Sequence, residues 1–143
     1  MEKLKTIQIG NENYPILCDL NVLDTLQNEF GSVHDFELAL MGVKYIKDKD
    51  GRQIYTEDGE PQIEVVEPSI KAIKIALVEM VNEGIAYKAY CENKSWDMLE
   101  DFEILVNCQI PFSELSNILH EEYKRCFETK KSTPRESKRK KTT

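Results

Sequence analysis

The chain has 143 residues, a net charge of −7 and 41% hydrophobic residues. This length suits one domain that buries a sizeable core. No apolar run reaches the roughly 18 residues of a membrane-spanning helix, and the N-terminus lacks the apolar centre of a signal peptide, so we expect a cytoplasmic protein without a membrane partner. The cysteines form no CxxC pair, which favours free thiols over a zinc site or a disulfide: Cys18, Cys91, Cys108 and Cys126.

Charge is distributed unevenly along the chain. Residues 128–143 contain seven Lys and Arg and two Glu, a net charge of +5, which leaves −12 on residues 1–127. The same C-terminal segment has no apolar periodicity. We therefore predict one acidic folded domain at 1–127 and a disordered basic tail at 128–143.

The beginning of the chain has the pattern of a β-hairpin. Residues 6–9 alternate polar and apolar side chains, residues 10–13 are typical of a turn, and residues 14–18 have the pattern of a returning strand. Pro15 cannot donate a hydrogen bond to a neighbouring strand, so this strand is expected at a sheet edge.

Two helices are predicted after the hairpin. Asp19 or Asn21 can cap the first helix, and Gly31 can end it in the left-handed conformation. Ser32 can cap the second helix, which Gly42 ends. The apolar residues of both helices fall at helical spacing: Val22, Leu23, Leu26 and Phe30, then Val33, Phe36 and Leu40.

Residues 43–68 differ in character from their neighbours. Turns that contain Asp-Gly separate three strand-like stretches, at 43–47, 53–56 and 62–66. The segment is interpreted either as a small β-ribbon or as an acidic connecting loop. A calcium loop is not expected, because Asp48 and Asp50 lack a third ligand in register.

Three more helices are predicted. Pro68 and Ser69 open a helix that Gly84 ends, with one apolar face formed by Ile70, Ile73, Leu77, Met80 and Val81. Residues 85–93 fit a helix or a loop. Ser95 can cap a further helix whose apolar face would hold Trp96, Leu99, Phe102 and Val106. Ser113 can cap the last, with an inward face formed by Leu115, Ile118, Leu119, Tyr123 and Cys126. The predicted fold is α+β and helix-dominated: an N-terminal β-hairpin, a bundle of about four to five helices and, if the middle segment pairs, a small β-ribbon.

No residue pattern indicates catalysis, a cofactor or a metal. The chain lacks a phosphate-binding glycine loop, a dinucleotide fingerprint and a Gly-x-Ser-x-Gly elbow. The two histidines stand beside no metal motif: His34 is expected to be exposed, and His120 precedes a solvated face at Glu121 and Glu122. We assign no catalytic, cofactor-binding or metal-binding residue and expect that the protein is not an enzyme.

Two apolar features have a functional interpretation beside the structural one. The apolar face of the helix at 70–81 is interpreted as core, and alternatively as a groove or a self-association surface. Trp96 is interpreted as a core anchor, and as a contact residue only if it is exposed. The binding surface is therefore left unassigned.

Several short motifs resemble those of a known family. They are residues 7–16 (IQIGNENYPI), 18–23 (CDLNVL) and 30–36 (FGSVHDF), and residues 70–84 are similar to the same family's second helical block. These motifs resemble the start of the tail assembly chaperones of long-tailed bacteriophages and of prophages in Gram-positive bacteria.

The resemblance implies that the protein works in the host bacterial cytoplasm and acts by binding other proteins. Such proteins hold the tape measure protein soluble while tail tube subunits assemble around it, and they are absent from the finished tail. The expected partners are the tape measure protein, the tail tube protein and further copies of the chain. The matching motifs contain residues that set turns and helix caps: Gly10, Pro15, Asp19, Asn21, Gly31 and Ser32. Because these roles are structural, the resemblance assigns no binding residue to this chain.

The alternative from another class is a small regulatory protein that contacts nucleic acid through its basic tail. The tail has no aromatic residue for base stacking, and the acidic remainder of the chain would repel a polyanion. Nucleic acid is therefore not the expected partner.

Overall fold

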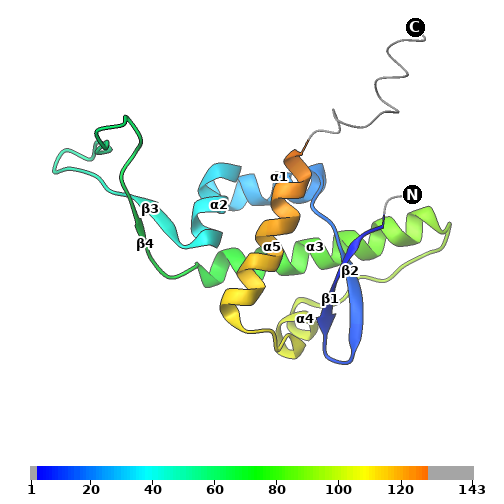
Figure 1. The fold of residues 1–143 in the computed structure, drawn as a ribbon. Coiled ribbons are helices and arrows are strands. Elements are labelled where there is room, and N and C mark those ends of the chain that lie inside the picture. The colour runs from blue at the N-terminus through cyan, green and yellow to red at the C-terminus, as the bar shows by residue number, and fades with distance from the viewer. Residues whose placement is uncertain (1–2, 129–143) are drawn as a thin grey trace, which may run out of the picture.

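The computed structural model describes residues 3–128, whose arrangement is shown in Figure 1. In chain order, the elements are β1 (Lys5–Ile9), β2 (Glu12–Ile16), α1 (Leu20–Phe30), α2 (Val33–Met41), β3 (Val43–Tyr45), β4 (Ile63–Val65), α3 (Ile70–Cys91), α4 (Asp101–Asn107) and α5 (Phe112–Phe127). The fold is α+β and helix-dominated, as predicted, with an N-terminal antiparallel hairpin and a second small sheet. The predicted basic tail lies outside the described residues, except for Glu128, and the domain boundaries stay a prediction.

Helix α3 is the centre of the structure. It packs against β2, α1, α2, α4 and α5, and the β3–β4 ribbon projects beyond its N-terminal end (Figure 1). Its side chains are buried around most of its circumference, which is typical of a central helix: Ala72, Ile73, Ala76, Leu77, Val78, Met80 and Val81. The predicted apolar face is confirmed except at Ile70, which is exposed. Within the described residues, no helix is long and apolar enough to cross a membrane.

The predicted helix boundaries in the first half of the chain are confirmed. Asp19, Ser32 and Ser69 each accept a hydrogen bond from the backbone N–H three residues later, at the starts of α1, α2 and α3. These bonds satisfy N–H groups that have no partner inside the helix. Gly31 and Gly42 end α1 and α2 at positive φ.

The middle segment forms a β-ribbon and not a loop. Strand β3 pairs antiparallel with β4, with Val43 opposite Val65. The predicted strand at 53–56 is not formed, and only isolated bridges hold that stretch. The Val66 N–H donates to the Gly42 carbonyl at 2.7 Å. This bond joins the residue after β4 to the residue after α2, and so holds β4 beside β3.

Gly84 does not end α3, so this prediction was wrong. The helix continues to Cys91, so most of residues 85–93, which fitted a helix or a loop, are helical. Gly84 lies where α3 approaches the backbone of β2: a Cβ at this position would be 2.2 Å from the Pro15 carbonyl oxygen. The glycine is therefore required for close packing of α3 against β2. In the sequence, a glycine with this role looks the same as a glycine that ends a helix.

The predicted starts of the last two helices were also wrong. Helix α4 begins at Asp101 and not after Ser95. Helix α5 begins after Pro111, whose carbonyl accepts the first helical hydrogen bond from Leu115 at 2.8 Å, so Ser113 lies inside the first turn. Proline suits this position because its fixed φ is compatible with a helix start. The inward face of α5 is buried or half-buried as predicted.

Candidate functional site

The two histidines make separate polar contacts. The Nε2 atom of His34, which is exposed as predicted, lies 2.7 Å from the Tyr45 hydroxyl, and Nε2 of His120 lies 2.8 Å from Oε2 of Glu37. Across residues 3–128, no group of three or more His, Cys, Asp and Glu side chains is placed to hold a metal ion. All four cysteines are free thiols.

Glu122 is buried, which corrects the prediction of a solvated face. Only 1% of its surface is exposed. Its Oε2 atom accepts a hydrogen bond from the Cys18 backbone N–H at 2.8 Å and lies 2.8 Å from Nη2 of Arg125. The same Nη2 donates to the Cys18 carbonyl at 2.8 Å. These bonds compensate the buried charge and hold the loop before α1 against α5.

The cluster of Glu122, Arg125 and the Cys18 backbone has a structural role. Only the pairing of Glu122 with Arg125 can be predicted from the sequence. The i, i+3 spacing of Glu122 and Arg125 on α5 is visible in the sequence, but the backbone that they hold is 104 residues away from Glu122. Burial raises the pKa of the Cys18 thiol above its ordinary value, so this thiol stays protonated and inert.

A second polar cluster joins α3 to the start of α1. A hydrogen bond with the Asp19 carboxyl, together with burial, raises the pKa of Glu83 from 4.5 to about 7. Nδ2 of Asn21, the cap candidate that α1 does not use, donates to Oε2 of Glu83 at 2.8 Å. Because the folded state binds this proton more tightly than the unfolded chain, the stability contribution of Glu83 falls as the pH rises from about 4.5 through about 7.

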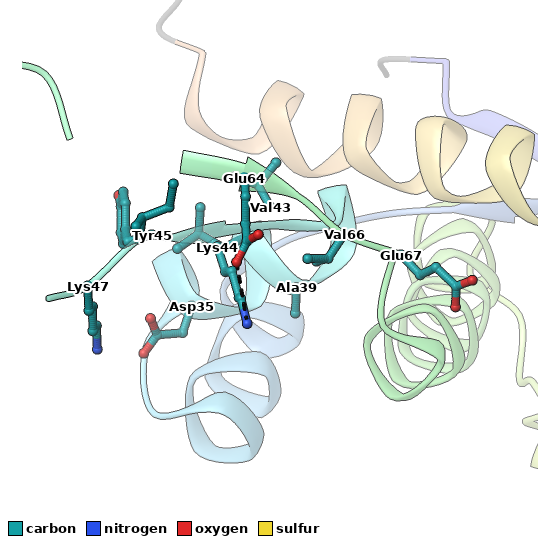
Figure 2. Close-up of a pocket in the computed structure, with 11 residues that line it drawn as sticks. Asp35, Ala39, Val43, Lys44, Tyr45, Lys47, Glu64, Val66 and Glu67 are labelled. Atoms are coloured by element: carbon teal, nitrogen blue, oxygen red, sulfur yellow. Dashed lines mark ion pairs between the residues drawn. The ribbon is translucent and has the colours of Figure 1, made fainter. Parts of the chain in front are cut away.

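A pocket of about 730 Å³ lies between α2 and the β3–β4 ribbon, as Figure 2 shows. Ala39, Val43 and Val66 contribute apolar surface, whereas Lys44 and Glu64 form an ion pair of 3.6 Å across the two strands. Sequence reasoning missed this pocket, because it depends on how the ribbon is placed against α2. Its apolar lining and charged side chains suit contact with a side chain of a partner.

Apolar side chains are exposed along residues 96–106, which lead into and form most of α4. We name these four side chains the α4 strip: Trp96 (46% exposed), Met98 (67%), Phe102 (76%) and Val106 (56%). The sequence placed Trp96, Phe102 and Val106 on one broad apolar helix face with Leu99, and of these four only Leu99 packs against the core. Because Trp96 is exposed and not a core anchor, it stays a candidate contact residue.

The buried side chain of Asn82 holds the segment before α4 against α3. Asn82 on α3 is 6% exposed; its Nδ2 donates to the Leu99 carbonyl at 3.2 Å, and its Oδ1 accepts from the Leu99 N–H at 2.8 Å. The side-chain amide thereby pairs with both backbone polar groups of Leu99, shortly before α4 begins at Asp101. The only sequence signal was an asparagine on an otherwise apolar part of α3.

The fold and these surfaces define a small, helix-dominated α+β protein with apolar side chains exposed at α4 and beside its β-ribbon. Comparison with protein-family models, with curated protein sequences and with solved structures finds no match to this chain.

Proposed function

We propose that this chain is a tail assembly chaperone of a long-tailed phage or prophage of Gram-positive bacteria. The observation that carries the proposal is the set of motifs at residues 7–16, 18–23 and 30–36, which resemble the start of that family. In this role the protein acts by binding and not by catalysis. It works in the host bacterial cytoplasm and is absent from the finished tail.

The proposed partner is the tape measure protein, with the tail tube protein and further copies of the chain as additional partners. A tape measure protein, as the resemblance implies, is a long and partly apolar helical rod that aggregates when it is uncovered. The α4 strip and the pocket beside the ribbon offer apolar contacts for such a rod. The net charge of −12 on residues 1–127 would keep the complex soluble.

Co-expression tests this function. The chain is produced together with a tape measure protein, and the soluble fraction of that protein is compared with and without the chain. We expect the soluble fraction to rise and the two proteins to co-elute from an affinity column. An acidic helical protein of similar size serves as the control. A tape measure protein that stays insoluble in the presence of this chain would refute the proposal.

The composition of residues 128–143 favours a second candidate, a regulator that contacts nucleic acid. This segment holds seven Lys and Arg residues. Binding through it should shift labelled DNA or RNA in a gel, weaken steeply with salt, and vanish when residues 130–143 are deleted. A shift that survives the deletion would exclude the tail as the binding element.

A further inference from the structure

The α4 strip combines exposed apolar side chains with uncompensated negative charge. Four acidic residues lie among its members: Asp97, Glu100, Asp101 and Glu103. None of these carboxylates forms an ion pair with any residue in the described part of the chain. The sequence has no Lys or Arg between Lys94 and Lys124. Acidic residues in the first turn of α4 interact favourably with the positive end of the helix dipole. The dipole does not explain the acidic residue at position 97, which lies before the helix, or the exposed apolar side chains.

The strip is held in place before any partner binds. The two hydrogen bonds between Asn82 and Leu99 fix the segment before α4 against α3. The fully buried Ile104 anchors α4, and the Gly10 N–H donates to the Asn107 carbonyl at 2.9 Å, which ties the end of α4 to the hairpin. A partner would therefore meet a preformed surface and lose little binding free energy to ordering it.

The spacing of the strip suits a helix. Trp96 and Met98 are two positions apart in the segment before α4, which forms neither helix nor strand, and Phe102 and Val106 are about one turn apart on α4. From Trp96 to Val106 the backbone spans at most about 24 Å, with about 3.3 Å for each extended residue and about 1.5 Å for each helical one. A helix of about four to five turns has this length.

We propose that the α4 strip binds an amphipathic helix with Lys or Arg residues beside its apolar stripe. The apolar stripe covers the exposed side chains of the strip, and the basic residues pair with the four carboxylates. Only the identity of the partner, a segment of the tape measure protein, rests on the proposed function. The chain's own residues 128–143 supply positive charge but no apolar side chain, so they do not match the strip.

Binding of a defined peptide tests the proposal. The probe is a fluorescein-labelled amphipathic helix of about five turns, with Leu at helical spacing and Lys on both flanks. One control peptide replaces every Lys by Glu, and a second shuffles the Leu and Lys positions. We expect the full-length protein to bind the Lys peptide at least about tenfold more tightly than either control. An unlabelled Lys peptide should shift the emission of Trp96, the single tryptophan, to shorter wavelength.

Matched variants locate the site. Met98→Ser with Phe102→Ser removes exposed apolar groups without touching the core, and should weaken binding about tenfold. Val65→Ser, at a position 83% exposed on β4, is the apolar control and should change nothing. Asp97→Asn with Glu100→Gln should weaken binding about threefold and flatten its salt dependence. The Glu100 side chain makes no capping hydrogen bond, so this change leaves α4 intact.

Several results would overturn the proposal. Equal affinity for the Lys and Glu peptides, or unchanged binding by Met98→Ser/Phe102→Ser, would exclude this site. A tighter peptide complex after deletion of residues 130–143 would make the tail the occupant. A dimer that Met98→Ser/Phe102→Ser dissociates in sedimentation would make a second copy the occupant.

Co-purification separates the site from the function. We expect Met98→Ser/Phe102→Ser to lose the tape measure protein while its far-UV circular dichroism is unchanged. If this variant still retains the tape measure protein, the site is refuted and the function stands. If the unaltered chain does not retain it, the function and the partner's identity are refuted, whatever the peptide does.

Discussion

Gly84→Ala tests the close approach of α3 to the hairpin. A Cβ at residue 84 would lie 2.2 Å from the carbonyl oxygen of Pro15 and 2.9 Å from the backbone nitrogen of Ile16. These are backbone atoms and cannot rotate away, so β2 must move. The movement would strain the hydrogen bond from the Leu17 N–H to the Met80 carbonyl, now 3.0 Å, and disturb the fully buried Ile16.

The expected net loss is about 2.5 kcal/mol of unfolding free energy. Alanine is better than glycine inside a helix by about 1 kcal/mol, so propensity alone predicts a stabilising change. Overpacking of a tight contact costs about 1–3 kcal/mol, and a weakened buried hydrogen bond with a displaced core side chain adds about 1–2 kcal/mol. The steric terms therefore exceed the propensity gain.

Urea unfolding followed by far-UV circular dichroism measures this loss. We expect the midpoint of Gly84→Ala to fall by about 1.5–2 M. Ala86→Gly, two positions further along α3, is the control and should cost about 1 kcal/mol, because it lies in the helix interior. A midpoint for Gly84→Ala equal to or above that of the unaltered chain would refute the close approach. A neutral Ala86→Gly would refute the continuation of α3 beyond residue 84.

Three further predictions concern single side chains. Asn82→Ala should cost about 2–3 kcal/mol and accelerate hydrogen exchange at the Leu99 amide, since two hydrogen bonds lose their partner; unchanged exchange there would contradict the contact. Glu83→Gln should raise stability at about pH 8 by on the order of 1 kcal/mol, with solvent screening allowed for, because the raised pKa of about 7 makes the ionised carboxyl unfavourable. Stability curves for Glu83→Gln and the unaltered chain should converge towards about pH 5, and parallel curves would exclude this effect. Iodoacetamide should label the exposed Cys91 in the folded protein and Cys18 only after unfolding, because burial shields the Cys18 thiol and raises its pKa; equal labelling by mass spectrometry would disprove this.

Features with nearby causes were predictable from the sequence. The caps at Asp19, Ser32 and Ser69 each depend on a side chain and a backbone N–H three residues later, so composition and spacing suffice. The hairpin follows from alternation and a turn within one short stretch. The motifs that resemble tail assembly chaperones lie in this same locally determined part of the chain.

Tertiary packing decided the features whose partners are distant in the chain. Gly84 has the sequence signal of a helix stop, and only its contact with Pro15 shows that it makes room for β2. Glu122 has the signal of a solvated acid, and only the Cys18 backbone beside it explains its burial.

The α4 strip shows the same limit at the candidate site. The sequence by itself determined the apolar residues at 96–106 and the acids among them. Their spacing also fits a buried helix face, so periodicity could not tell exposure from burial. Only the tertiary structure decided: the Asn82 amide on α3 binds the Leu99 backbone, α4 begins only at Asp101, and Ile104 is the α4 residue that is buried. A side chain that completes the hydrogen bonds of a distant backbone leaves no periodic pattern in the sequence.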